Sequence, residues 1–399
     1  MSQRLPSLRR GIDLFPSPSD DHPGIVIRDQ MRYTDAMLVI PPIWILALPC
    51  LDGEHTALDV QEAITRQTGH IIDSEIIAEF INTLDQQGFL ETETFAQMRE
   101  SKQAEFRDAS DRGPVYSTNY PPSTMDEYFA GAPPAPGADL VGGGLVGIAA
   151  PHVSPEGGWR SYAAAYRKIT PELADRVFVL LGTSHYGQPE KFGLTRKPYT
   201  TPLGSARVET SMLDKLVKLA PDAVIEEDYC HAVEHSIEFQ VMFLQHVMQR
   251  PVTILPILCG AFADSLETGR PPESRFFDAL AELAAEHGKR LCWILGIDMA
   301  HMGARYGHDF TATANEGDMT IVAARDQARL ERICQSDARG FLDLVLPSGD
   351  DLNWCGYAPL YTFLRAMPKT PGKVLSYEQW NIDPQSIVSF GALEFQNRR

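Results

Sequence analysis

Histidine and aspartate residues follow long apolar runs at three places in this sequence. His152 ends the segment LVGIAAPH and His185 ends RVFVLLGTSH, while RLCWILGIDMAH carries Asp298 and His301. Imidazole and carboxylate groups are the usual protein ligands of zinc and iron, and two histidines with one acidic residue are typical of non-haem ferrous sites. A single histidine is more often a hydrogen-bonded core or loop residue, but the repetition predicts a metal or catalytic site.

A second group of chemically active residues lies in the segment CHAVEHSIEFQ. On a helix beginning near Glu234, the side chains of His235 and Glu238 lie on one face. That arrangement suits a general base, or a partner that fixes the tautomer of a metal ligand. The alternative is an acidic first helical turn in which Glu234 interacts with the helix dipole. We interpret His235 as functional and His231 as structural.

A third candidate is Cys355, in the segment NWCGYAPLY. A helix is expected after it, and a helix N-terminus lowers the pKa of a thiol, which makes the thiol a nucleophile or a soft metal ligand. A buried cysteine that acts only as a small apolar side chain is the more frequent case.

These residues need a common framework to meet. The apolar runs at 145–152, 176–185, 252–260 and 290–301 alternate with expected helices, for example at 206–220, 235–248 and 274–288. This alternation predicts an α/β fold with a mostly parallel sheet flanked by helices on both faces. Ligands bind such sheets beyond the carboxyl ends of the strands. His152, His185, Asp298 and His301 should therefore converge at one edge.

The first 95 residues differ from the rest and predict a small α+β winged-helix domain. We expect a hairpin in GIVIRDQMRYTDAMLVIP, an apolar helix in PPIWILALPCLDG, and a helix capped by Thr56 and ended by Gly69. A third helix should close at Gly88, with FLETETF as a short strand. Residues 96–140 are polar and rich in proline, which predicts a helix followed by a linker and surface segment that enters a second domain spanning 106–399.

Composition excludes several classes of partner. The 399 residues carry a formal net charge of −18, which opposes nucleic acid and anionic membranes at long range. The six cysteines form no CxxC pair, and the start of the sequence has no signal-peptide pattern. We therefore expect reduced thiols and a cytoplasmic protein. Membrane insertion is not expected, since no apolar run reaches the roughly 20 residues of a spanning helix.

The sequence resembles the Memo family over about residues 106 to 396. The motifs that carry the resemblance occur in the family's order: APH, LLGTSH, EHSIEFQ, ILPILCG, GIDMAHMG, CGYAPLY and SIVSFGALEF. The family is similar to class III extradiol dioxygenases, so the resemblance implies their α/β fold and a non-haem iron.

The resemblance also implies roles for individual residues. The metal ligands fall on His152, His185 and Cys355, with Asp298 as an alternative third ligand. Asp298, His301 and His235 become catalytic candidates, of which His235 or His301 would move a proton. The pocket would include Tyr186, Glu238 and Tyr357. A His2Cys set favours Fe(II), with Cu or Zn as alternatives.

The sequence departs from the family pattern at the expected pocket rim. Val153, Ser154 and Pro155 follow the first motif, with Glu156 nearby. Tyr186 replaces the second histidine of SHH, and CGRHP reads CGYAP, with Tyr357 and Ala358. The substrate is therefore less transferable than the fold.

The N-terminal segment resembles PqqD-like winged-helix domains, which bind a peptide as an added strand. A structural or dimerising role is an equally good interpretation. Two functions follow. The first is an iron-dependent oxidoreductase acting on a phenolic, catecholic or peptide-borne substrate. The second is a non-catalytic peptide-binding scaffold, because Memo-like proteins accompany radical-SAM and AMMECR1-type proteins in a modification system. A hydrolase with Cys355 as nucleophile is a third hypothesis.

Overall fold

The structure is a computed structural model that describes residues 3–17, 19, 21–133, 144–262, 273–346 and 349–397. The chain divides into two compact units, Met1–Ala109 and Ser110–Arg399. The first unit extends past residue 95 because helix α4 (Glu93–Asp108) groups with it. Phe95 of α4 is buried, and the guanidinium of Arg9 lies 3.7 Å from the centre of its ring. The expected linker therefore begins with a helix of the first unit.

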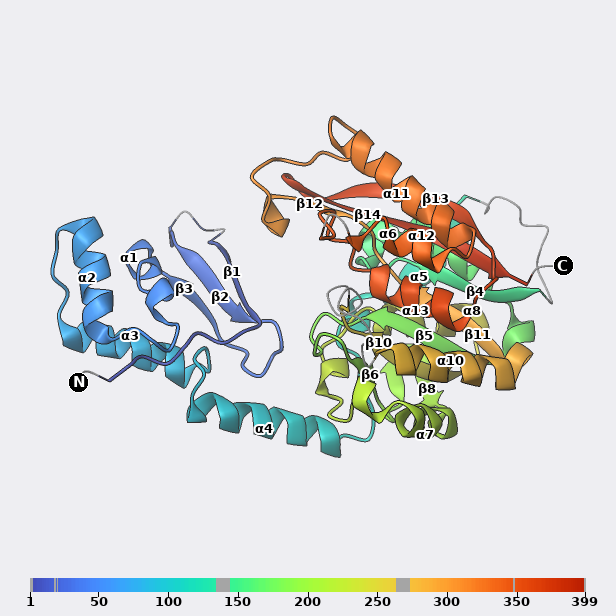
Figure 1. Cartoon of the computed structure of the whole chain (residues 1–399), viewed down its shortest axis with the longest axis horizontal. Coiled ribbons are helices and arrows are strands. Elements are labelled where there is room, and N and C mark those ends of the chain that lie inside the picture. Colours follow the sequence, from blue (N-terminus) through green and yellow to red (C-terminus); the bar gives the residue numbers. More distant parts are fainter. Residues whose placement is uncertain are drawn as a thin grey trace. The chain divides into compact units, whose positions relative to one another are not determined.

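The N-terminal unit contains a three-stranded antiparallel sheet in the order β1-β2-β3. Its strands are β1 (Ile12–Pro16), β2 (Ile25–Asp29) and β3 (Met37–Ile40) (Figure 1). The expected hairpin is confirmed as β2 and β3, in which Val26 pairs with Val39. Strand β1 was not expected from the sequence.

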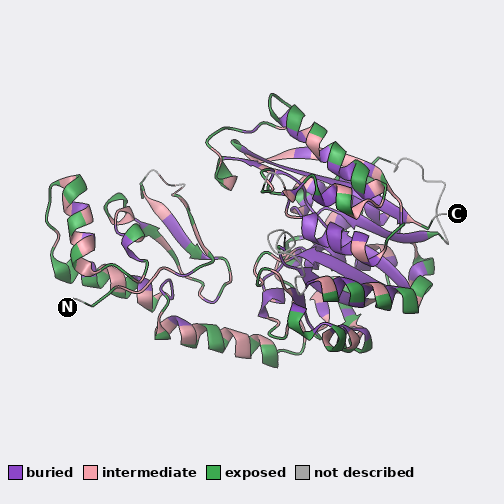
Figure 2. Cartoon of the chain, viewed as in Figure 1, coloured by how far each residue is buried: buried purple, intermediate pink, exposed green. Residues whose placement is uncertain are grey.

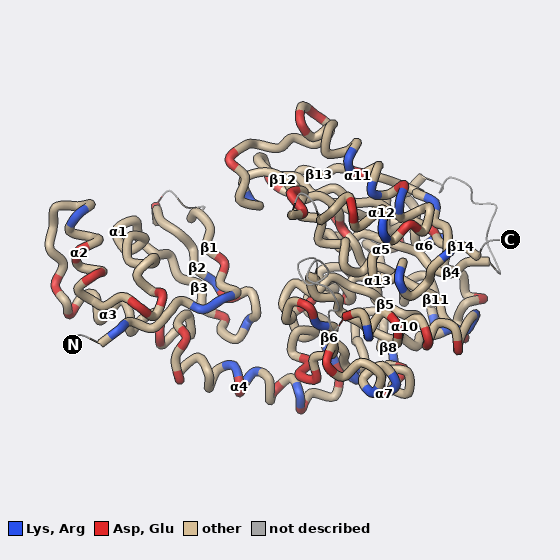
Figure 3. Tube along the Cα trace, viewed as in Figure 1, with Lys and Arg blue, Asp and Glu red and all other residues tan. Residues whose placement is uncertain are grey.

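Helices follow the sheet in this unit; the expected apolar helix is shorter than predicted, whereas both ends of the next helix match the sequence signals. They are α1 (Pro42–Ile45), α2 (Ala57–Thr68) and α3 (Ser74–Gln86). Thr56 and Asp59 form a capping box at the start of α2, and Gly69 ends it with a φ of +74°. The expected strand FLETETF is wrong in extent: only Leu90 forms a bridge, with Leu8, and α4 starts at Glu93. Both charge signs alternate along α4 (Figure 3).

The C-terminal unit is built on a central parallel sheet. Strands β4 (Leu145–Ala150), β11 (Leu291–Gly296), β5 (Val177–Thr183) and β10 (Thr253–Cys259) lie in that order and pair in parallel. Every residue of β4, β5 and β11 is buried, as the purple strands in Figure 2 show. Their continuous apolar sequences are explained by helices covering both faces.

Antiparallel and short strands extend this sheet to eleven strands. Strand β14 (Ser386–Gln396) pairs with β4 on one side, and β6 (Phe192–Leu194) pairs with β10 on the other. The remaining strands are β7 (Tyr199–Thr201), β8 (Gly204–Val208), β9 (Val224–Ile225), β12 (His301–Gly303) and β13 (Gly372–Asp383).

Helices pack on both faces of the sheet, which confirms the expected fold class. Side chains of α5 (Pro122–Gly131), α6 (Pro155–Tyr166) and α8 (Glu238–Met248) share one apolar core. The other core is shared by α7 (Thr210–Leu219), α10 (Glu273–His287), α11 (Met319–Cys334), α12 (Ala338–Leu342) and α13 (Tyr357–Ala366). Short 3-10 turns occur at Leu48–Cys50, Ser117–Asn119, Pro171–Leu173, Pro221–Ala223, Tyr229–His231, Gly288–Arg290 and Ala304–Tyr306.

Two expected helices begin later than the sequence indicated. Residues 204–208 form β8, which pairs with β7 and β10, so α7 begins at Thr210 instead of 206. Helix α8 begins at Glu238 instead of 235. His235 therefore lies in the loop before the helix. Among the described residues, every helix is too short or too polar to cross a membrane.

Candidate metal centre

Three histidines gather beyond the carboxyl ends of the central strands. His152 and His185 follow β4 and β5, and His235 lies in the loop before α8. One ring nitrogen from each lies within 4.8 Å of the others. The rings of His185 and His235 stack at 4.8 Å between centres, and the ring of His152 stands at 90° to that of His185. The predicted convergence of His152 and His185 is confirmed, and a third imidazole joins them.

His152 is held in the tautomer that a metal ligand needs. Its Nδ1 lies 3.0 Å from the carbonyl oxygen of Gly296, which can only accept, so Nδ1 carries the proton and Nε2 keeps its lone pair. The side chain is buried, and burial lowers its pKa to about 3. The imidazole is therefore neutral at physiological pH, the form that binds a metal.

Glu234 fixes the other two histidines. Its carboxylate oxygen Oε1 lies 3.0 Å from Nδ1 of His185 and 3.3 Å from Nδ1 of His235. The carboxylate also accepts the backbone N–H groups of His185, His235 and Ser236, at 2.9, 2.9 and 3.0 Å. Carboxylate–histidine pairs of this kind orient a metal-binding ring and make it a stronger donor. In His185 this hydrogen bond leaves Nε2 for a ligand.

The charges around Glu234 follow from this geometry. Burial alone would raise its pKa, but the neighbouring His185 lowers it well below the ordinary value. Burial lowers the pKa of His185, and the attraction of Glu234 outweighs this, so the net shift is upward. Burial lowers the pKa of His235 to about 3. From the sequence, Glu234 was considered only as a possible helix-dipole charge, in the alternative interpretation of this segment. Its role beside the histidines was missed, and the signal for it was an acidic residue directly before His235.

Glu238 was expected to lie on one helical face with His235, and this prediction is wrong. Because α8 begins at Glu238, the two residues do not share a helical face, and the Glu238 carboxylate forms an ion pair with Arg112. It also accepts the backbone N–H groups of Val115 and Ser117, at 2.9 and 2.8 Å. Glu238 therefore anchors the segment before α5.

Cys355 and Asp298 lie beside His152. The thiol sulfur of Cys355 is 3.2 Å from Nε2 of His152, and carboxylate oxygen Oδ2 of Asp298 is 3.5 Å from the same atom. The other Asp298 oxygen accepts the backbone N–H of His152 at 2.9 Å. The compact group of three thus has His235 where the resemblance implied Cys355, and the thiol and carboxylate flank it.

Burial decides the protonation of both flanking groups. It raises the pKa of Asp298 to about 6. Burial and the nearby Asp298 raise the pKa of Cys355 well above its ordinary value. The expected lowering by the helix N-terminus is therefore wrong for the metal-free site, although Cys355 does precede α13 as predicted. A protonated thiol is a poor nucleophile.

The remaining predicted residues occupy different positions. His301 begins β12, and its Nδ1 donates to the carbonyl groups of Met299 and Asn353, at 2.9 and 3.0 Å. The ring of Tyr186 lies 6.0 Å from that of His185. The hydroxyl of Tyr357 accepts the backbone N–H of Phe262 at 2.8 Å, and Tyr357 is buried. Tyr357 therefore fixes the chain after β10.

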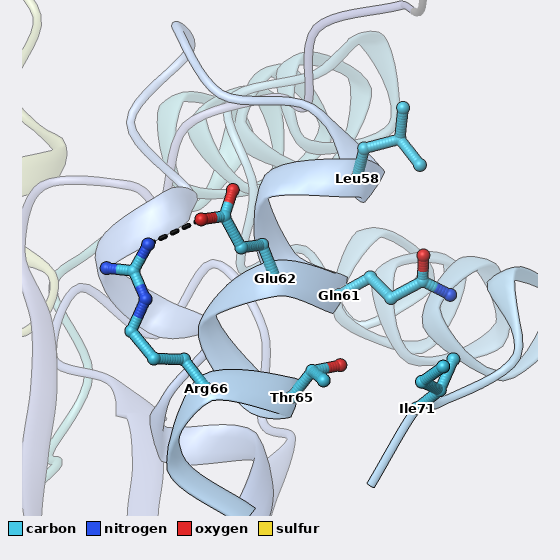
Figure 4. Close-up of a pocket in the computed structure, with 6 residues that line it drawn as sticks. All are labelled: Leu58, Gln61, Glu62, Thr65, Arg66 and Ile71. Carbon is cyan, nitrogen blue, oxygen red and sulfur yellow. Dashed lines mark hydrogen bonds and ion pairs between the residues drawn. The ribbon is translucent and has the colours of Figure 1, made fainter. Parts of the chain in front are cut away.

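A separate hollow of about 390 Å³ lies on the N-terminal unit (Figure 4). Its lining residues are Leu58, Gln61, Glu62, Thr65, Arg66 and Ile71. Glu62 and Arg66 form an exposed ion pair across one helical turn of α2. The hollow shares no residue with the histidine group, and its lining has no histidine or cysteine.

Comparison with known proteins identifies the fold that holds these histidines. Residues 124–394 match the family model described as Memo-like protein. The chain belongs to the Memo-like family. A MEMO1 family protein of Aquifex aeolicus is 23% identical to it over 385 residues, which cover 93% of this chain and 95% of that protein. The match to this Memo-like chain therefore extends into both of its units.

Two relatives from Methanosarcina match a shorter part of the chain. A MEMO1 family protein of Methanosarcina mazei is 28% identical over 257 residues, covering 62% of this Memo-like chain and 85% of the relative. A MEMO1 family protein of Methanosarcina acetivorans is 30% identical over 212 residues, which cover 52% of this chain and 68% of that protein.

Proposed function

We propose that the C-terminal unit is a mononuclear non-haem iron oxidoreductase. The single observation that carries the proposal is the convergence of the ring nitrogens of His152, His185 and His235 within 4.8 Å of one another. Nδ1 of His152 and of His185 are held by Gly296 and Glu234, which leaves Nε2 of both rings for a ligand, and Nδ1 of His235 lies 3.3 Å from the same Glu234 carboxylate. This is a preorganised donor set.

The donor chemistry fits a borderline divalent metal. Imidazole nitrogens bind Fe(II), Cu and Zn in preference to Mg or Ca, and the thiol of Cys355 adds a soft donor beside them. The Asp298 carboxylate offers the acidic ligand that many ferrous sites use. We propose Fe(II) as the native ion, with Cu or Zn as alternatives.

The residues around the group suit acid–base work. A bound ferrous ion would supply a site at which dioxygen and an electron-rich aromatic substrate are held together. Asp298, whose pKa burial raises to about 6, can hold or release a proton near neutral pH. Nδ1 of His301 is committed to two carbonyl oxygens, so His301 would exchange protons through Nε2. We propose a phenolic, catecholic or peptide-borne substrate.

A hydrolase using Cys355 has less support. The raised pKa of this thiol leaves it protonated at neutral pH when no metal is bound.

Peptide binding by the N-terminal unit is a second candidate function. Strand β3 ends the order β1-β2-β3, and its residues Met37 and Val39 are 61% and 41% exposed. An edge strand with exposed apolar side chains can accept a further strand. We propose that this unit presents a peptide within a modification system that includes radical-SAM and AMMECR1-type proteins. Retention of a defined peptide by the full chain, lost on Val39→Pro, would test it; equal retention would argue against it.

The metal proposal is tested by anaerobic reconstitution with Fe(II) of protein purified without chelators or nickel. We expect one iron per chain by elemental analysis, and a large loss of iron in His185→Ala. His246→Ala is the matched control, because His246 lies on α8 beside Phe129 and outside the group. No binding by the wild type, or equal binding by His185→Ala, would overturn the proposal.

A further inference from the structure

A buried carboxylate on α11 connects the two segments that flank the histidine group. Asp326 is completely buried. Its Oδ1 accepts the indole N–H of Trp354 at 2.6 Å. Its Oδ2 accepts the hydroxyl groups of Ser389 and Tyr377, at 2.6 and 2.8 Å. Three donors from separate parts of the chain thus meet one side chain.

The first connection leads to Cys355. Trp354 directly precedes Cys355 and is held at two points, the indole by Asp326 and the backbone N–H by Asp350, at 2.6 Å each. Arg329 supports the same arrangement, because it pairs with Asp350 at 3.1 Å and lies 5.3 Å from the Trp354 ring centre. The position of the Cys355 backbone is therefore set from the side of α11.

The second connection leads to Asp298 and His301. The Ser389 hydroxyl donates to Asp326 and accepts the backbone N–H of Ala300 at 2.8 Å. The backbone groups of Ser389 and Ala300 are also bonded to each other, at 2.9 Å. Ala300 lies between Asp298 and His301 in the sequence.

The two segments also contact each other at the site. The backbone N–H of Gly356 donates to the carbonyl of Asp298 at 2.9 Å, and that of His301 donates to the carbonyl of Leu352 at 2.8 Å. A displacement of one segment therefore moves the other. Asp326 is hydrogen-bonded toward both segments, through Trp354 and through Ser389.

We propose that Asp326 is a positioning residue that sets the Cys355 thiol and the Asp298–His301 segment against His152, through Trp354 and Ser389. The hydrogen bonds described for Asp326 go to Trp354, Tyr377 and Ser389, and not to the three histidines. Its importance for chemistry rests on the proposed function, but its effect on Cys355 can be measured without metal.

The test uses the metal-free full chain and maps iodoacetamide alkylation of each cysteine by mass spectrometry. In Asp326→Asn the amide nitrogen cannot accept the Ser389 or Tyr377 hydroxyl, so both connections weaken. We expect Cys355 to be alkylated about tenfold faster than in the wild type, as lost hydrogen bonds release its segment. Cys334, on the same helix and equally half-buried, should keep its rate.

Controls separate positioning from general loosening. Glu331→Gln makes the same acid-to-amide change at an exposed site of α11 and should alter neither cysteine. If Asp326→Asn does not fold, Trp354→Phe removes the indole donor together with part of the buried ring and should also speed the alkylation of Cys355. Unchanged Cys355 rates, or equal acceleration of Cys334 and the buried Cys292, would overturn the proposal. If the wild type bound no iron, the proposed function would be overturned instead. The alkylation result would still test the role of Asp326, because it is measured on the metal-free chain.

Discussion

At the residue scale, Glu234 is the side chain on which the histidine group depends most. It holds two of the three imidazoles and is fully buried, so a neutral replacement loses both charge-assisted contacts. We expect Glu234→Gln to bind Fe(II) about 10 to 100 times more weakly than the wild type. Anaerobic titration against a competing chelator measures this.

Glu226→Gln is the control for that prediction, because Glu226 is exposed and lies eight residues earlier in the same segment. Its iron affinity should equal that of the wild type. An unchanged affinity in Glu234→Gln would show that the ring orientations do not depend on this carboxylate.

A second residue-scale prediction concerns His231 and acid stability. Its ring is fully buried, its Nδ1 lies 2.7 Å from the Tyr199 hydroxyl oxygen, and burial lowers its pKa from 6.5 to about 4. Below pH 6.5 the unfolded chain therefore binds a proton that the folded chain does not. This contribution to stability is complete above pH 6.5 and is lost as the pH falls.

At pH 4 the loss amounts to roughly 3 kcal/mol from this group. We expect the free energy of unfolding of His231→Gln, measured in urea on metal-free protein, to fall less steeply between pH 6.5 and 4 than that of the wild type. Parallel curves for the two proteins would contradict the assignment of His231 as a buried neutral imidazole.

At the scale of elements, Arg112 secures the loop that carries Glu234 and His235. Its guanidinium donates to the carbonyl groups of His231 and Glu234, at 2.9 and 2.6 Å, and pairs with Glu238. All these groups are buried, so removing the cation leaves a buried carboxylate without its counter-charge. We expect Arg112→Met to lower the free energy of unfolding by about 3–5 kcal/mol.

The double variant Arg112→Met/Glu238→Gln should recover part of that loss, because the uncompensated charge is gone. Arg339→Met removes an exposed ion pair with Asp343 and should cost less than about 1 kcal/mol. A cost for Arg112→Met as small as that of Arg339→Met would contradict the role assigned to Arg112.

The strand ends of the site were predictable and the loop was not. His152 and His185 follow short apolar runs that are typical of buried strands, and parallel strands bring their ends together. The placement of His235 depends on where α8 begins. Spacing alone favoured a helix from Glu234, but the bonds of Glu234 to His185 and of Glu238 to residues 115–117 start the helix later. Such contacts between distant segments leave no local pattern.

At the scale of the whole molecule, the alternation of strands and helices predicted the parallel core but not its edges. The antiparallel strands β14 and β6 complete the sheet through pairings between distant segments, which periodicity does not specify. In the N-terminal unit the caps of α2 could be predicted from the sequence because they depend on neighbouring residues. The pairing of β1 with β2 could not be predicted in this way.

The division into two units yields another prediction. All the residues of the histidine group and its flanking groups lie in Ser110–Arg399, which has its own apolar cores. We expect a protein of residues 110–399 to bind Fe(II) with an affinity within about twofold of the full chain, since the three histidines and their flanking groups all lie in this unit. Anaerobic titration of both proteins measures this. A much weaker affinity in a folded fragment would show that the first unit contributes to the site.

The iron-binding predictions above depend on three imidazoles holding one metal ion. X-ray absorption at the iron edge of the Fe(II)-reconstituted full chain tests this claim most directly, because imidazole rings give a distinctive multiple-scattering signal. We predict the signal of three imidazoles, reduced to two in His235→Ala. A spectrum with two imidazoles or fewer in the wild type, or one unchanged by His235→Ala, would contradict the claim.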